Sequence, residues 1–221
     1  MHLFADRSDA GRRLADALDA YARRGDVIVL ALPRGGVPIA YEIARRLRAP
    51  LDVYVVRKLG VPGHEELAMG ALASDGTCVM DDDLIDSLGI DERAIDAVIK
   101  REIEELRRRE VAYRGNKPEP DIAGKTVIVV DDGLATGATM RAAAAALRLR
   151  DPAAIVAAVP VAAARTCKNL RDAVDRVVCL ATPEPFHAVG LYYRNFEQTS
   201  DDEVRRLLSE AARETGRRVG A

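Results

Sequence analysis

Residues 127–140 read VIVVDDGLATGATM, and this stretch constrains the fold more than any other part of the chain. Four consecutive apolar residues, Val127 to Val130, do not alternate with polar ones, which is typical of a parallel strand covered on both faces. Asp131 and Asp132 follow where that strand is expected to end. A turn of small residues comes next, and the alanine-rich segment 140–149 has strong helix propensity. The order of strand, acidic pair, small-residue turn and helix predicts an α/β unit with a ligand site at the turn.

The turn after the acidic pair has the composition of a phosphate-binding loop. Small residues let backbone N–H groups approach a phosphate, and a helix that begins there adds unpaired N–H groups and a positive dipole end. Thr136 and Thr139 can add hydroxyl donors. The two carboxylates can accept hydrogen bonds from vicinal hydroxyls or reach a magnesium ion bound to them. A ligand with a 5′-phosphate and a free 2′,3′-diol would satisfy all these groups. The Gly-Lys-Ser/Thr ending of a Walker loop is absent.

This stretch resembles the phosphoribosyl pyrophosphate (PRPP) signature of type I phosphoribosyltransferases, a hydrophobic run followed by Asp-Asp-x-x-x-Thr-Gly-x-Thr. The alternative is an ordinary strand–turn–helix, whose turn also favours Asp, Gly and Thr. The resemblance implies that Asp131 and Asp132 bind the ribose, act in catalysis and bind Mg²⁺ directly or through the diol. It implies that the 5′-phosphate is bound by Ala135, Thr136, Gly137, Ala138 and Thr139.

Composition narrows the class of protein. The chain of 221 residues is long enough for one domain with a real core, so we expect a single domain over 1–221. A net charge of −2 argues against binding nucleic acid through bulk charge. The sequence has no apolar run of membrane-spanning length and no signal-peptide pattern at its N-terminus. Cys78, Cys167 and Cys179 lack metal-ligand spacing and fit free thiols in a reducing cytoplasm. We expect a cytoplasmic homodimer that does not bind membranes.

Strand and helix patterns alternate along most of the chain, which predicts right-handed crossovers and a mainly parallel twisted sheet flanked by helices. Ligands then collect beyond the carboxyl ends of the strands. The N-terminal helix is expected to be capped by Ser8 or Asp9. Further strands are expected over 27–32, 51–56, 155–159 and 177–180, and further helices over 37–47, 162–170 and 201–213.

A helical insertion of about residues 81–115 breaks this alternation. It is strongly charged, and Ile95, Ile99, Ile103 and Leu106 are spaced along one face. The cluster Arg107–Arg109 is compatible with nucleic-acid binding, but an ion-paired, solvated helix face is the favoured interpretation. The pairs Glu104–Arg108 and Glu105–Arg109 have the spacing that such a face requires.

A second candidate loop, LPRGGVP over residues 32–38, follows the first predicted strand. Paired glycines before a helix expose backbone N–H groups, and Arg34 adds a planar fork for a second anionic group. Most Arg-Gly-Gly sequences are plain turns. In the resembling family this loop holds pyrophosphate, often through an unusual backbone conformation, which would assign Arg34, Gly35 and Gly36 to pyrophosphate binding.

The segment 55–70 carries Arg57 and Lys58 at a strand end and is then rich in Gly and Pro. We expect a mobile loop with glycine hinges. In the resembling family such a loop closes over PRPP, which excludes water, and its cations neutralise the departing pyrophosphate. Arg57 and Lys58 are therefore candidate catalytic and pyrophosphate-binding residues. A surface loop with solvated charges is the alternative. His64 is interpreted as incidental.

The C-terminal segment, about 181–221, is expected to form a hood on the acceptor side. It holds four of the nine aromatic residues of the chain, among them Phe186 and Tyr192. An aromatic ring there could stack on a heterocyclic base, as in a loop of 6-oxopurine phosphoribosyltransferases, or simply cover the edge of the sheet.

The resemblance covers about residues 27–180 and has one informative departure. Hypoxanthine–guanine enzymes carry an acid just before the Thr-Gly pair, where this chain has Ala135. Parts of the motif look more like adenine phosphoribosyltransferase, and the overall likeness is to predicted bacterial phosphoribosyltransferases of undefined acceptor. The expected activity is transfer of a 5-phosphoribosyl group from PRPP to a nitrogenous acceptor, with Mg²⁺ as cofactor and release of pyrophosphate. A sensor of PRPP or a nucleotide on the same fold, and the reverse reaction, are the alternatives.

Overall fold

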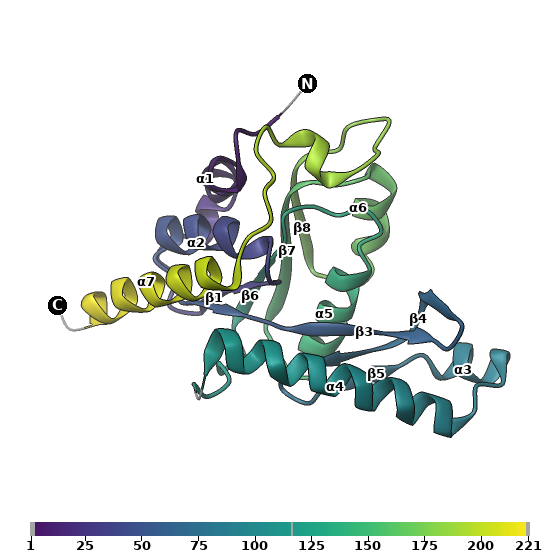
Figure 1. Ribbon diagram of the computed structural model, residues 1–221. Helices are drawn as coiled ribbons and strands as arrows, with labels where there is room; N and C mark the ends of the chain where they lie inside the picture. Colours follow the sequence, from purple (N-terminus) through teal and green to yellow (C-terminus); the bar gives the residue numbers. More distant parts are fainter. Residues whose placement is uncertain (1–2, 116, 220–221) are drawn as a thin grey trace.

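The structure, a computed structural model, describes residues 3–115 and 117–219 and is built around a five-stranded parallel sheet (Figure 1). The strand order is β2-β1-β6-β7-β8, so β6, which leads into the acidic pair, lies at the centre. The strands are β1 (Val27–Ala31), β2 (Leu51–Val53), β6 (Thr126–Val130), β7 (Ala154–Val161) and β8 (Arg176–Ala181). The predicted α/β fold with a mainly parallel sheet is confirmed.

Strands β1 and β6 end at the same level because Ala31 pairs with Val130. Every residue of both strands is buried, as expected for apolar runs without alternation. Successive side chains point to opposite faces of the sheet, so Ile128 joins the core on one face while Val127 and Val129 join the core on the other. The loops that follow the two strands therefore emerge side by side at one edge of the sheet.

Helices cover both faces of the sheet. Helices α1 (Arg7–Ala17) and α2 (Gly36–Leu47) pack on one face, and α5 (Ala138–Arg148) and α6 (Ala164–Leu170) pack on the other (Figure 1). A short 3₁₀ turn, η1 (Asp19–Tyr21), follows α1.

The first helix is capped two or three residues earlier than predicted. The side chain of Asp6 accepts a hydrogen bond from the backbone N–H of Asp9 at 2.8 Å, so the N-cap is Asp6 and the predicted caps Ser8 and Asp9 are wrong.

The segment expected to be a loop, residues 55–70, forms strands instead. A second, antiparallel sheet contains β3 (Val56–Val61), β4 (His64–Ala73) and β5 (Cys78–Met80). The turn between β3 and β4 is at Pro62 and Gly63, where Gly63 has a φ of 79°. Leu59 and Met69 are fully buried, and the tertiary burial of such side chains outweighs the turn-forming tendency of the glycines.

The expected insertion is helical, with α3 (Asp82–Leu88) followed by the long helix α4 (Glu92–Arg114), which packs against β3 and β4. The expected ion pair between Glu105 and Arg109 is present at 2.7 Å, and Arg108 also pairs with Glu105 at 2.8 Å. Hydrogen bonds from Arg108 and Arg109 lower the pKa of Glu105 to about 2.

The C-terminal segment crosses from β8 back to the N-terminus. It includes the 3₁₀ turn η2 (Val189–Tyr192), and Tyr193 pairs with Phe4 before the chain enters α7 (Asp201–Val219). Helix α7 packs against α2 and α4. Val204, Leu207 and Leu208 are buried, which confirms the predicted apolar face of this helix.

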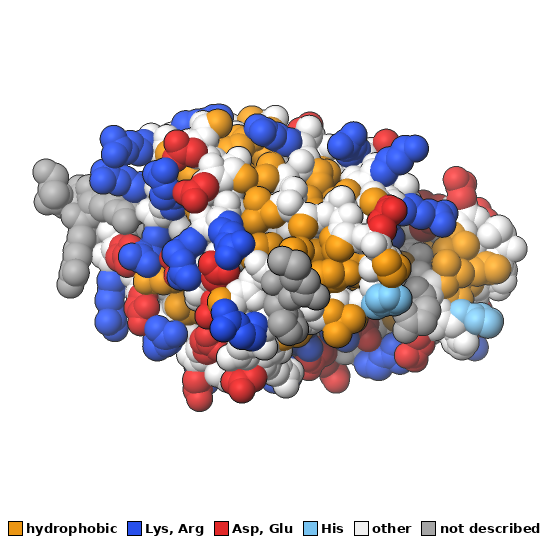
Figure 2. Space-filling view, turned by 90° about the horizontal axis from the view of Figure 1, so that it is seen from above, with side chains coloured by type: hydrophobic (Ala, Val, Ile, Leu, Met, Phe, Trp, Pro, Cys, Tyr) orange, Lys and Arg blue, Asp and Glu red, His pale blue; other side chains and the backbone are white. Residues whose placement is uncertain are grey.

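The surface carries mixed charge. On the face shown in Figure 2, Lys and Arg side chains are interspersed with Asp and Glu, and hydrophobic side chains gather near the middle. Within residues 3–115 and 117–219, no helix combines the length and the apolar character that crossing a bilayer requires.

Candidate active site

The acidic pair lies at the carboxyl end of the central strand β6. The Oδ1 atom of Asp131 accepts a hydrogen bond from the backbone N–H of Asp132 at 2.8 Å. Burial raises the pKa of both carboxyl groups; the charge of Asp132 raises that of Asp131 further, whereas Arg7 opposes the rise at Asp132. Both carboxyls are thus largely removed from water, which strengthens any hydrogen bond they accept from a ligand hydroxyl.

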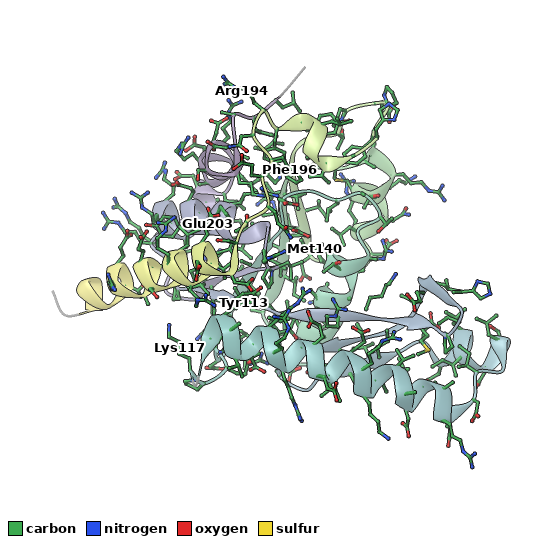
Figure 3. The ribbon with its side chains drawn as sticks, in the orientation of Figure 1. Tyr113, Lys117, Met140, Arg194, Phe196 and Glu203 are labelled. Atoms are coloured by element: carbon green, nitrogen blue, oxygen red, sulfur yellow. The ribbon has the colours of Figure 1, made fainter. Side chains whose placement is uncertain are left out.

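A cation from the first helix holds Asp132. The Nε and Nη2 atoms of Arg7 donate to Oδ2 of Asp132 at 3.0 and 2.8 Å, and both side chains are mostly buried. The Arg7 guanidinium also lies 3.9 Å from the ring centroid of Phe196, close to α1 (Figure 3), and donates to the backbone oxygen of Glu197 at 2.7 Å. Sequence reasoning missed Arg7. Its signal is a cation in the first turn of a helix, where the dipole disfavours positive charge.

The predicted phosphate loop lies between β6 and α5. Gly137 has a φ of 71° and caps α5, a left-handed conformation that favours glycine. A Cβ atom at this position would also come within 2.7 Å of the methyl group of Thr166. The hydroxyl of Thr166 donates to the backbone oxygen of Ala135 at 2.6 Å, and this hydrogen bond holds the loop in place. Thr136 and Thr139 are exposed at the N-terminus of α5, where an anion would meet the helix dipole.

The Arg-Gly-Gly loop follows β1 and touches the acidic pair. A Cβ atom on Gly35 would lie 2.0 Å from Oδ2 of Asp132, and one on Gly36 would lie 2.4 Å from the backbone oxygen of Val130. The peptide bond between Pro33 and Arg34 is cis, in keeping with the unusual backbone conformation expected for this loop. Only glycine allows this close approach, so the contact brings the two candidate loops into one site.

The side chain of Arg34 points to the start of α7. Its Nη1 atom lies 3.5 Å from Oδ1 of Asp201. Tyr113, on the last turn of α4 (Figure 3), donates to the same oxygen at 2.8 Å. Arg34 is thus linked to α4 through Asp201.

Arg57 and Lys58 lie on β3 and line a cavity of about 380 Å³. The same cavity is lined by Pro33 of the Arg-Gly-Gly loop and Thr139 of the phosphate loop. The Nε and Nη2 atoms of Arg57 lie 2.7 and 2.6 Å from Oε2 of Glu102 on α4. The structure therefore brings the two predicted cations together with both candidate loops, and it gives Arg57 an acidic partner.

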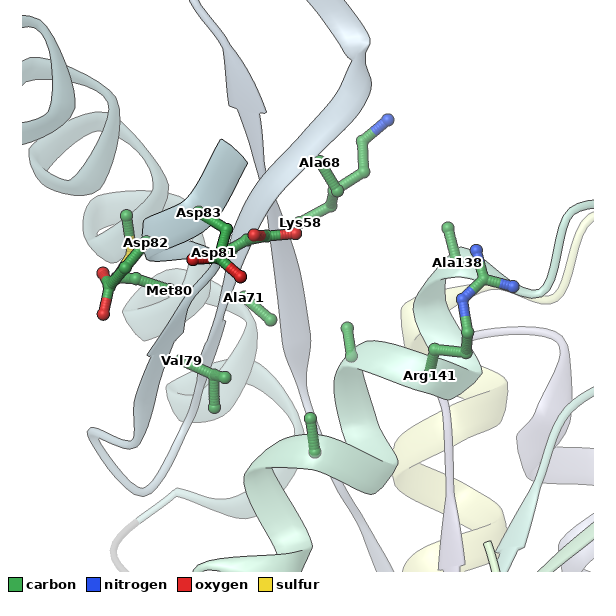
Figure 4. A pocket seen from close by; sticks show the side chains of 13 residues that line it. Lys58, Ala68, Ala71, Val79, Met80, Asp81, Asp82, Asp83, Ala138 and Arg141 are labelled. Atoms are coloured by element: carbon green, nitrogen blue, oxygen red, sulfur yellow. The ribbon is translucent and has the colours of Figure 1, made fainter. Parts of the chain in front are cut away.

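A larger cavity of about 600 Å³, also lined by Lys58, lies between the second sheet and α5 (Figure 4). Asp81 and Asp83 line it on one side, and Arg141 lines it on the other. The Nη1 atom of Arg141 donates to the backbone oxygen of Thr136 at 2.9 Å, so this cavity borders the phosphate loop.

The two aromatic residues predicted on the acceptor side stack on each other. The ring centroids of Phe186 and Tyr192 are 5.3 Å apart with an interplanar angle of 29°, and both rings pack against the cluster around Phe4. This packing fits the alternative interpretation, a cover for the sheet edge. The aromatic residue at the acidic pair is Tyr193, whose hydroxyl donates to the backbone oxygen of Asp132 at 2.6 Å.

A magnesium ion would need oxygen ligands beyond the protein. Among residues 3–115 and 117–219, no group of three or more His, Cys, Asp or Glu side chains is placed to hold a metal. Mg²⁺ is commonly bound by one or two carboxylates together with substrate phosphates and water. Asp131 and Asp132, adjacent at the end of β6, fit that mode of binding.

Known proteins match most of the length of this chain. The sequence model of the phosphoribosyl transferase domain matches residues 5–194. Proteins from two strains of Mycobacterium tuberculosis, provisionally named phosphoribosyl transferases, are 48% identical over 214 residues; the match covers 97% of this chain and 48% of theirs. The chain thus spans about half the length of these relatives. The crystal structure of TT1426 from Thermus thermophilus is 40% identical, has a TM-score of 0.86 and is matched over 95% of this chain and 99% of TT1426. The chain therefore belongs to the phosphoribosyl transferase family.

Proposed function

We propose that the protein transfers a 5-phosphoribosyl group from PRPP to a nitrogenous acceptor and releases pyrophosphate, with Mg²⁺ as cofactor. The observation that carries the proposal is the contact between the Arg-Gly-Gly loop and the acidic pair, where Gly35 leaves no room for a Cβ atom beside Asp132. A diol binder and a candidate pyrophosphate binder in contact match the ribose hydroxyls and the pyrophosphate of PRPP, the two groups that lie on either side of its reacting carbon C1′.

The chemistry follows from the positions of these groups. Residues 135–139 bind the 5′-phosphate, Asp131 and Asp132 bind the ribose hydroxyls, and the 34–36 loop with Arg57 and Lys58 binds pyrophosphate. The acceptor nitrogen forms a bond to C1′ while the bond from C1′ to the pyrophosphate oxygen breaks, and the electron pair leaves with pyrophosphate. The protein contributes orientation and the stabilisation of the departing charge. Bound Mg²⁺ would supply further neutralisation of the pyrophosphate oxygens.

The first test is binding. Calorimetry with PRPP and Mg²⁺ should show saturable binding, and thermal unfolding should shift to higher temperature because the site exists only in the folded chain. Ribose 5-phosphate, which lacks the pyrophosphate, is the matched ligand and should bind more weakly. No binding at millimolar PRPP would overturn the proposal.

A sensor that binds PRPP without turnover is the second candidate. It is favoured by the ion pair of Arg57 with Glu102, because this cation already has a partner within the protein.

Substitution of Lys58 by Ala separates the two candidates. In an enzyme, a cation on the leaving group stabilises the transition state more than bound PRPP, so kcat should fall by about a hundredfold with a smaller change in PRPP affinity. The measurement is pyrophosphate release across a panel of bases and amines, for wild type and Lys58→Ala. In a sensor, the wild type would bind PRPP tightly and release no pyrophosphate with any member of the panel.

A further inference from the structure

Helix α4 borders the cavity that holds Arg57 and Lys58. Three of its residues, Arg101, Glu102 and Arg109, line that cavity. Glu102 and Arg109 are seven residues apart, which places them on the same face of a helix. The sequence predicted a solvated, ion-paired face for the cluster Arg107–Arg109, and the fold places Arg109 of that cluster at the cavity.

The cavity is rich in cations. Among the side chains that the structure describes, its lining contains four cations, Arg57, Lys58, Arg101 and Arg109, and two carboxylates, Glu65 and Glu102. The net surplus of positive charge is focused in a concave space, a setting in which the local potential favours anions. Its volume of about 380 Å³ is within the range of small-molecule sites.

Two carboxylates of α4 hold the three arginines of this lining in place. Glu102 is almost fully buried, with 9% of its side chain exposed, and it accepts hydrogen bonds from Arg57 at 2.7 Å and from Arg101 at 3.1 Å. Glu105 accepts from Arg109 at 2.7 Å. A guanidinium has five N–H donors, so an arginine bound to one carboxylate keeps donors for a second anion.

We propose that α4 forms a wall of the pyrophosphate subsite and that Arg101 and Arg109 bind the pyrophosphate group of PRPP. This inference rests on the proposed function. It gives the helical insertion a role in substrate binding, and it assigns Glu102 as a positioning residue that orients Arg57 and Arg101 toward the same anion.

The test is calorimetric titration of the full chain with inorganic pyrophosphate and Mg²⁺. Arg109→Ala is compared with Arg108→Ala, because both arginines pair with Glu105 but only Arg109 lines the cavity. Arg101→Ala is compared with Lys100→Ala, its exposed neighbour. Arg101→Ala and Arg109→Ala would each remove a charged hydrogen bond to pyrophosphate, so the affinity of each variant should fall about tenfold. The two control variants should lose less than about twofold.

The outcomes separate this inference from the proposed function. If the wild type binds neither pyrophosphate nor PRPP, the proposed function fails. If the wild type binds both, and Arg101→Ala and Arg109→Ala each bind pyrophosphate as tightly as their control variants, the subsite is confined to the loops and the inference is overturned. Thermal unfolding checks that each variant folds, and Arg109→Lys, which keeps the charge, should recover part of the lost affinity.

Discussion

Substitution of Gly35 by Ala tests the contact on which the proposed site depends. The added Cβ atom would lie 2.0 Å from Oδ2 and 2.6 Å from Cγ of Asp132. Neither distance is compatible with van der Waals contact, so the loop or the carboxylate must move. Asp132 is held by Arg7 through two hydrogen bonds of 3.0 and 2.8 Å, which oppose its displacement.

The energetic cost depends on which group moves. If the loop shifts, overpacking costs about 1–3 kcal/mol. If Asp132 rotates away, its mostly buried pair with Arg7 is broken, at a cost of up to about 3–5 kcal/mol. Either movement separates the pyrophosphate loop from the ribose-binding acid. We therefore expect a melting temperature lowered by about 2–4 °C for each kcal/mol, together with loss of PRPP binding.

The assay combines thermal unfolding with calorimetry of PRPP and Mg²⁺. Gly25→Ala is the matched control, because a Cβ atom there would have no neighbour within 4 Å. It should leave both the melting temperature and the PRPP affinity close to wild type. A Gly35→Ala protein with wild-type stability and wild-type PRPP affinity would refute the close packing of the two loops.

Three further outcomes are expected. The double change Asp131→Asn and Asp132→Asn should weaken PRPP binding at least about tenfold by calorimetry, because amides are weaker acceptors for the diol; normal turnover would make these residues structural. Tyr193→Phe removes the donor to the backbone of Asp132 and should lower the free energy of unfolding in urea by about 1–3 kcal/mol. Asp175 accepts a hydrogen bond from the backbone N–H of Ile155 at 2.7 Å, which lowers the pKa of its carboxyl group. The ionised carboxylate therefore stabilises the fold above the ordinary Asp pKa, and this stabilisation is lost as the pH falls through the lowered pKa. Asp175→Asn should therefore lower stability by about 0.5 kcal/mol at pH 7 and by less in acid; an equal difference at both pH values would contradict this assignment.

Local sequence determined the central unit of the site. The apolar run 127–130, the acidic pair and the small-residue turn are contiguous, and each has a local signal: an apolar run without alternation, a glycine at the left-handed position 137, and a helix that begins directly after it. The parallel sheet followed from the same pattern repeated along the chain. These features needed no knowledge of distant partners, which is why the sequence predicted them correctly.

The tertiary structure decided which distant side chains complete the site. Arg7 and Asp132 are 125 residues apart in sequence, and Arg57 and Glu102 are 45 apart, so no local pattern encodes either pair. Packing also turned the expected loop 55–70 into strands, because burial of Leu59 and Met69 outweighs the glycines. Sheet register brought Gly35 against Asp132, and helix α4 came to lie along the cavity of Arg57. The amino-acid order determines which groups are present, but only the folded chain sets the distances between them, and binding depends on those distances.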